Sequence, residues 1–208
     1  MVVIHRVFRR EFPRVAQLID GAPAGDLGRA EDIAAHLEFV LTEVAHHHHG
    51  EDEYLWPKLL ARVKVGTGLI HRMRTQHVAV TEAGQRVTAL LAQWRRTAAV
   101  SVASELAQAL RELSSVLGEH LDEEEASVLP LVVENITVAE WAELGELTMA
   151  RFPRGALVTM LGQVLEEATK ADRALFFGKL PPPARLAWRL YGRRRYARYT
   201  RRVRGEAV

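Results

Sequence analysis

Two short stretches of the sequence place histidine and carboxylate side chains at a spacing suited to metal binding. The stretch HHHGEDEYLWP begins at His47 and the stretch HLDEEEASVLP begins at His120. Both read H-x-x-x-E, with a proline six residues after the glutamate. Residues four apart on a helix share one face, so the His and the Glu of each stretch can bind one cation. The chemistry that these residues indicate is metal binding through nitrogen and oxygen atoms.

The two stretches are copies of one pattern within the chain. The His, the Glu and the Pro of the first recur in the second at a constant offset of 73 (120 − 47), and two single histidines elsewhere are 72 apart (77 − 5). Each half of the repeat therefore contributes one single His and one His/Glu pair. The candidate metal ligands are His5, His47, Glu51, His77, His120 and Glu124.

The elements that must position these residues are helices. Apolar residues recur at intervals of three and four along most of the chain, whereas short β-branched runs bounded by turn signals are scarce. Turn signals at 21–26, 65–68 and 97–101 divide the first 135 residues into four long segments. We therefore predict an all-α fold: an up-and-down four-helix bundle over 1–135, followed by a helical extension over 136–208.

The candidate ligands fall within the apolar stripes of these predicted helices. In the first helix, for example, His5 is in register with Phe8, Phe12 and Val15. Burying an ionisable group without a partner costs several kcal/mol, and a whole domain is stable by only about 5–15 kcal/mol. Six such groups need compensation, and two divalent cations would provide it.

The run of four histidines at 46–49 leaves one ambiguity. Successive helical residues are about 100° apart, so at most one or two of the four can face one site. The repeat and the apolar stripe both select His47, and its neighbours are expected at an interface or in solvent. His48 precedes Asp52 by four residues, however, so spacing alone leaves His48 open as the ligand in place of His47.

Composition excludes several other kinds of chemistry. The chain has no cysteine, which excludes disulfides, thiolate metal sites and thiol catalysis. No apolar run is long enough to cross a bilayer, and the first twenty residues carry charges where a signal peptide needs an apolar core. We therefore expect a cytoplasmic protein.

The extension differs from the bundle in charge. Thr137 and Glu140 form a predicted capping box that begins a fifth helix. Residues 183–208 contain nine Arg and one Glu, so this tail has a formal charge of +8. Because the net charge of the chain is +2, the residues before the tail carry −6. Aromatic residues alternate with the arginines, and residues 183–204 could contact an anionic surface. The favoured interpretation is that the tail packs on the acidic bundle, with no clear nucleic-acid or membrane partner.

These motifs resemble the hemerythrin-like HHE cation-binding domain, a four-helix bundle with a non-haem di-iron centre. The resemblance covers about residues 1–133, and the extension is similar to one that accompanies some actinobacterial members. It implies two iron ions in an oxo- or hydroxo-bridged centre, held by the six candidate residues, with Glu51 and Glu124 bridging. Manganese or zinc would accept the same ligands and is not excluded.

One departure from the oxygen-carrying hemerythrins suggests what the centre does. Those proteins have a further ligating His one turn before the third-helix His, where this chain has Met73. Of the ~12 positions around two six-coordinate irons, the expected ligands fill ~10. Open positions favour turnover, so we expect a protein that binds or processes O2, H2O2 or NO, as a di-iron oxidoreductase. The alternatives are a metal, oxygen or redox sensor, or an iron storage or repair protein, that acts through the extension.

The predicted helical register can be tested by substituting two histidines. His120→Ala should lower the bound metal sharply, because it removes a buried ligand, whereas His49→Ala should leave it unchanged. Elemental analysis of protein purified without a His tag measures both. The opposite result would show that the register is wrong.

Overall fold

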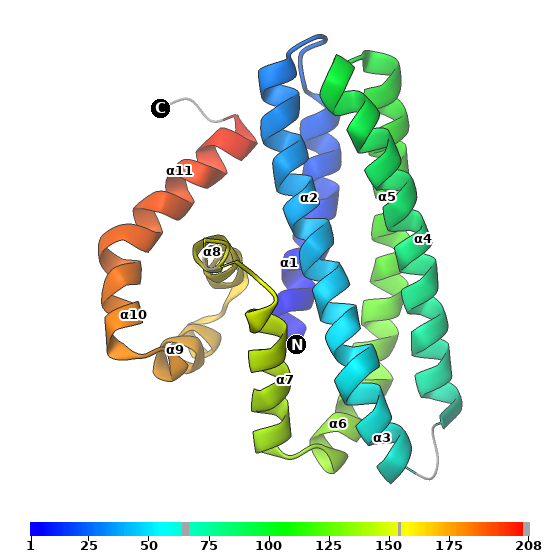
Figure 1. The fold of residues 1–208 in the computed structure, drawn as a ribbon, viewed down its shortest axis with the longest axis vertical. Coiled ribbons are helices and arrows are strands. Elements are labelled where there is room, and N and C mark those ends of the chain that lie inside the picture. The colour runs from blue at the N-terminus through cyan, green and yellow to red at the C-terminus, as the bar shows by residue number, and fades with distance from the viewer. Residues whose placement is uncertain (64–66, 154, 206–208) are drawn as a thin grey trace. The chain divides into compact units, whose positions relative to one another are not determined.

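The structure is a computed structural model that describes residues 1–63, 67–153 and 155–205. Within these ranges every regular element is a helix, which confirms the predicted all-α fold (Figure 1). None of these helices combines the length and the apolar character that crossing a bilayer requires. The helices are α1 (Val2–Asp20), α2 (Leu27–Gly50), α3 (Trp56–Arg62), α4 (Thr67–Thr97), α5 (Val100–Glu123), α6 (Leu129–Asn135), α7 (Val138–Ala150), α8 (Leu157–Glu167), α9 (Lys170–Lys179), α10 (Pro182–Ala187) and α11 (Arg193–Arg204), with π-helical segments η1 (Glu51–Leu55), η2 (Glu124–Val128) and η3 (Trp188–Gly192).

Two of the three predicted turns separate helices as expected. The first lies between α1 and α2, where the side chain of Asp26 accepts a hydrogen bond from the backbone N–H of Arg29 and caps α2. The third lies between α4 and α5. Of the turn predicted at 65–68, Thr67 and Gly68 already belong to α4, and residues 65 and 66 lie outside the described residues.

The chain divides into two compact units, of which Glu11–Arg151 is the larger. Its long helices are α2, α4, α5 and the part of α1 from Glu11 onward, which lie lengthwise beside one another (Figure 1). Two polar contacts hold this part of α1 in the bundle. Asp20 accepts a hydrogen bond from Arg111 of α5 at 2.9 Å, and Glu11 lies 3.2 Å from His36 of α2. The predicted domain boundary at residue 135 stays a prediction.

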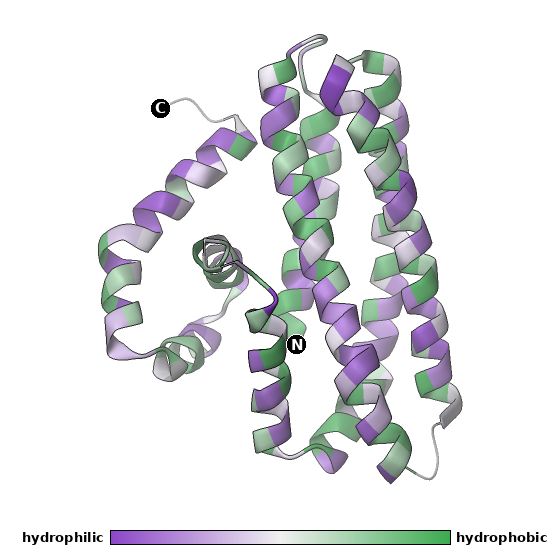
Figure 2. Cartoon of the chain, in the orientation of Figure 1, coloured by the Kyte–Doolittle hydropathy of each residue, from purple (hydrophilic) through white to green (hydrophobic). Residues whose placement is uncertain are grey.

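Large apolar side chains fill the centre of the larger unit. The long helices each carry both hydrophobic and hydrophilic residues along their length (Figure 2). The hydrophobic ones turn inward, because each buried large side chain contributes about 1.5–3 kcal/mol to stability. The bulkiest fully buried side chains include those of Phe12, Leu37, Trp56, Leu91 and Trp94. This apolar core surrounds the polar groups described below.

A glycine at the end of α2 allows α7 to pack closely against it. A Cβ atom at Gly50 would lie 2.9 Å from Oγ1 of Thr148 and 3.2 Å from Cδ1 of Leu144, both on α7. A larger residue at this position would push the two helices apart. The close approach of α7 thus explains why glycine follows the histidine run.

Ion pairs join α7 to α3 at the opposite end of α7. The predicted capping box is present, since Thr137 and Glu140 each accept from the other's backbone N–H. Glu140 also accepts hydrogen bonds from Arg62, at 2.7 and 2.9 Å, and from Lys58 at 3.1 Å. The Arg62 contact, followed by the Thr137 N–H and Lys58, lowers the pKa of Glu140.

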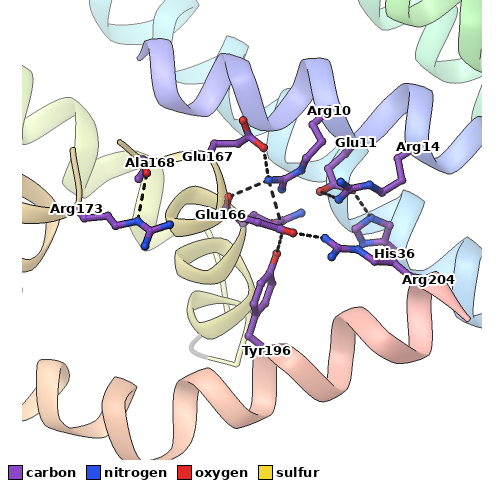
Figure 3. A network of polar contacts seen from close by, with 11 residues as sticks. Arg10, Glu11, Arg14, His36, Glu166, Glu167, Ala168, Arg173, Tyr196 and Arg204 are labelled. Atoms are coloured by element: carbon purple, nitrogen blue, oxygen red, sulfur yellow. Dashed lines mark hydrogen bonds and ion pairs between the residues drawn. The ribbon is translucent and has the colours of Figure 1, made fainter. Parts of the chain in front are cut away.

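The smaller unit consists of Met1–Arg10 and the residues from Phe152 onward. Its apolar core brings Val3 and Val7 of α1 against Val164 and Ala168. Glu166 of α8 accepts hydrogen bonds from Tyr196 at 2.7 Å and from Arg204 at 2.5 Å (Figure 3). The basic tail is therefore anchored on α8, whereas its packing on the bundle and its contact with an anionic surface stay predictions.

The ion pairs of Glu140 predict a pH-dependent contribution to stability. Glu140→Gln should lower the free energy of unfolding. Because the folded-state pKa of Glu140 lies below its usual value of 4.5, this loss should be largest above pH 4.5 and should shrink as the pH falls below it. Urea unfolding with a chelator present, at pH 7 and at pH 3.5, measures the effect.

Glu134 of α6 supplies a matched control, because it is exposed and has no polar partner among the described residues. Glu134→Gln should change stability little at either pH. An equal loss for Glu140→Gln at both pH values would contradict the assigned role of the carboxylate.

Candidate metal site

Glu51 stands at the centre of a polar cluster in the bundle. It begins η1, where α2 ends, and it is almost fully buried. His47 and His48 precede it by four and three residues, so both imidazoles lie on its side of the helix. Nε2 of His47 is 3.2 Å from Oε1 of Glu51. His48 is buried too, so the prediction that it lies at an interface or in solvent is wrong, whereas His49 is exposed.

Four buried side chains from different helices form the first group of possible ligands. Each offers one ligand atom, and these atoms all lie within 4.8 Å of one another. The ring of His48 stacks on that of His77 with centroids 4.0 Å apart, and the ring of His120 meets that of His77 edge-on at 4.7 Å. The members are His48 from α2, Glu51 from η1, His77 from α4 and His120 from α5.

A second group shares Glu51 with the first. Within the larger unit its members are His47, Glu51 and Glu124, whose ligand atoms again lie within 4.8 Å of one another. Glu124 begins η2 and is fully buried, and its Oε2 is 3.9 Å from Nε2 of His120. Two cations placed in these groups would therefore be neighbours on either side of one carboxylate.

His5, the sixth predicted ligand, is fully buried on α1. Its segment, Met1–Arg10, belongs to the smaller unit, so its role as a ligand stays a prediction. The structure thus brings together five of the six predicted residues and adds His48 to them.

Both His/Glu pairs run directly into a π-helical segment. The N–H of Trp56 donates to the carbonyl of Glu51, and the N–H of Leu129 donates to that of Glu124, each across five residues. Pro57 and Pro130 follow and have no N–H to continue the α-helical pattern. Such π-turns occur often at functional sites. Apolar periodicity alone predicts α-helices here, and the repeated proline is the one feature of the sequence that signals the change.

Side chains behind the imidazoles fix the direction in which they point. Nδ1 of His77 lies 3.0 Å from Oδ2 of Asp52, and Nδ1 of His120 lies 3.1 Å from Oε1 of Gln76. Gln76 in turn donates to Glu123 at 2.8 Å, which fixes its own orientation. When Nδ1 donates to these oxygens, Nε2 presents its lone pair to the group. Spacing along the chain predicts neither contact, since Asp52 and Gln76 come near these histidines only in the folded chain.

Two side chains of this cluster carry buried polar atoms that no hydrogen bond satisfies within the described residues. Neither carboxylate oxygen of Glu51 has a hydrogen-bond partner among the described residues, nor has Nε2 of His77. These two side chains approach to 3.5 Å, between Nε2 and Oε2, without a hydrogen bond. Buried polar atoms normally find partners, so this cluster is not an ordinary hydrogen-bonded core. A cation between the atoms would satisfy them, and the residues fit that group.

Burial changes the acidity of both carboxyl groups. It raises the pKa of Glu51 to about 8, and it raises the pKa of Glu124 well above its usual value, with the nearby charge of Glu51 as the next cause. Burial thus favours the protonated form of both groups, whereas a bound cation would favour their carboxylate forms.

Two other histidines and Met73 lie outside the two groups. His36 is paired with Glu11 (Figure 3). His71 is exposed. Met73 is fully buried on α4, one turn before His77. Among the described residues no other cluster of His, Asp and Glu comes together in this way.

The chain matches a known protein family. The sequence model described as the hemerythrin HHE cation-binding domain matches residues 1–132, which is more than half of the chain. No curated protein and no solved structure matches the chain. The matched range includes all six predicted ligands and His48.

The contact behind His77 predicts an effect on metal affinity. Asp52→Ala should weaken metal binding by about 10–100-fold, because the ring of His77 loses the acceptor that orients it. Glu53→Ala is the matched control, since Glu53 is the next residue, is exposed and has no polar partner among the described residues. Titration of metal-free protein with ferrous iron measures both affinities. Equal affinities for the two variants would show that Asp52 has no such role.

Proposed function

Because the chain belongs to the hemerythrin HHE cation-binding domain family, we propose that its bundle holds two iron ions and binds or processes O2, H2O2 or NO. The observation that carries the proposal is the pair of overlapping ligand groups that share the buried carboxyl of Glu51. Imidazole and carboxylate donors suit iron, and the absence of cysteine excludes a thiolate site.

The proposal divides the ligands between two neighbouring ions. One ion would be held by His48, His77 and His120 and the other by His47 and Glu124, and Glu51 belongs to both groups. His5 would complete the second set. Its burial supports this role, and so does the family match, which covers the first residues of α1 together with the rest of the bundle.

Bound iron supplies one-electron redox chemistry and open coordination positions for a small ligand. The protein supplies orientation, charge and a dry surrounding. Asp52 and Gln76 hold the imidazoles so that each presents Nε2 to the ions. Burial raises the pKa of Glu51, and as a carboxylate this group would neutralise positive charge of ions held inside the bundle. Trp56, whose ring centroid lies 6.0 Å from that of His77, is fully buried and helps to exclude water.

Metal analysis tests the proposal directly. Fresh, folded protein should contain about two iron ions per chain, one for each ligand group, and should absorb in the near ultraviolet. Removal of the iron should lower the melting temperature, since a ligand at 100 times its Kd stabilises the folded state by about 2.7 kcal/mol. Less than one ion per chain, with melting unchanged on adding iron, would refute the proposal.

Single substitutions test the division of the ligands between the ions. His47→Ala and His48→Ala should each reduce the iron content toward one ion per chain, because each removes a donor from a different group. Turnover of H2O2 and NO and uptake of O2, measured on the wild type and both variants, should fall in parallel. A full complement of two ions in His48→Ala would return the ligand role to His47 alone.

A further inference from the structure

A groove on the larger unit leads to the first ligand group. It lies between α2 and α4, has a volume of about 690 Å³, and reaches His48, His77 and Asp52 at one end. Apolar side chains from four helices line its inner wall: Phe12, Val44, Val80 and Leu113. A free diatomic molecule or a peroxide needs far less space than this.

The threonines along the groove make its walls more apolar than their residue type suggests. Thr42 donates its hydroxyl hydrogen to the backbone carbonyl of Glu38 at 2.8 Å, and Thr81 donates to that of His77 at 2.8 Å. Thr88 does the same with Gly84 at 2.9 Å. Each hydroxyl hydrogen is thus already used within its own helix and is not available to a ligand. The threonines therefore offer mainly their methyl groups to the groove.

The shape and the polarity of the groove define a class of ligand. Its wall along α4 extends from His77 to Thr88, a distance of eleven helical steps (88 − 77), which corresponds to about 16 Å of helix. Apolar side chains dominate the inner wall. His48, His77 and Asp52 lie at the end near the ligand group, whereas Glu38, which accepts a hydrogen bond from Arg95, lies toward the other end. A second hollow of about 590 Å³ also reaches His77 and Asp52, but charged residues such as Arg74 and Glu82 line it. Water and hydrophilic reagents have that separate approach.

We propose that the groove between α2 and α4 binds a medium-chain aliphatic molecule whose oxygen-bearing end lies at His48 and His77. The inference rests on the proposed function and deepens it. The substrate of the centre is then an aliphatic oxygen compound, such as an alcohol or a hydroperoxide, rather than a free diatomic molecule alone. Each methylene group buried in the groove strengthens binding about three- to fourfold.

Gly84 provides a variant that closes the groove without disturbing the fold. It lines the groove on α4, and a Cβ atom added there meets only Cδ2 of Leu41, at 4.0 Å. Gly84→Phe would therefore place its ring in the groove without displacing the backbone. Gly118 of α5 is the matched control, because a Cβ atom there meets nothing within 4 Å and Gly118 does not line the groove.

The test uses the full chain and a series of linear alcohols as probes: 1-hexanol, 1-octanol and 1-decanol. Affinities are measured by ligand-observed NMR on metal-free and iron-loaded protein. For the wild type and Gly118→Phe the affinity should rise about three- to fourfold per methylene group. Gly84→Phe should bind 1-decanol at least tenfold more weakly. Equal affinities in Gly84→Phe and Gly118→Phe, or no dependence on chain length, would overturn the proposal.

The orientation of the ligand has its own measurement. In iron-loaded protein, the protons next to the hydroxyl of 1-decanol should relax faster than those of its terminal methyl group, because the polar end lies at the iron. The opposite gradient would overturn the proposed orientation. Iron content is measured on the same samples. A wild type without iron would defeat the proposed function, whereas the alcohol series on metal-free protein would still decide whether the groove binds aliphatic molecules.

Discussion

The burial of two carboxyl groups among imidazoles is the constraint on which the rest of the structure depends. Glu51 and Glu124 lie inside the bundle, where a charged carboxylate without compensation would cost more than the fold can supply. Two states resolve this cost: both groups keep their protons, or cations take the place of those protons. The raised pKa values describe the first state, and the unsatisfied atoms of Glu51 and His77 favour the second. This part of the bundle therefore calls for either protons or cations at the two carboxyl groups.

The repeat in the sequence is also a repeat in the backbone. At Glu51 and again at Glu124, an α-helix gives way to a π-helical segment, and a proline follows near the start of the next helix. The first copy adds an adjacent histidine, so that His47 and His48 both border one carboxyl and join different ligand groups. In the second copy, Leu121 stands at the position that corresponds to His48. There His120 belongs to the first ligand group and Glu124 to the second. The duplication thus supplies a common framework, and one extra imidazole makes the two groups unlike.

Helix α4 has two roles that explain its position beside α2. Its His77 closes the first ligand group, and Asp52 orients that ring from across the helix pair. The same face continues into the groove wall, where Gly84 leaves space that a larger residue would fill. On another side of α2, Gly50 admits α7 at close range. Residues without side chains thus determine where the neighbours of α2 pack closely and where they leave an opening.

Much of this molecule follows from the sequence alone. Apolar periodicity predicted the all-α fold, and the Thr137–Glu140 pair marked where α7 begins. The repeat identified His47, His77, His120 and Glu124, which meet around Glu51. These features depend on local spacing, which a sequence states directly. The tertiary structure decided whether His48 points inward, because neighbouring helical residues differ by about 100° and packing sets the rotation of the helix. It also decided the partnership of Asp52 with His77 and of Gln76 with His120, and the opening between α2 and α4. These contacts join residues from different helices, and their distances depend on how those helices pack.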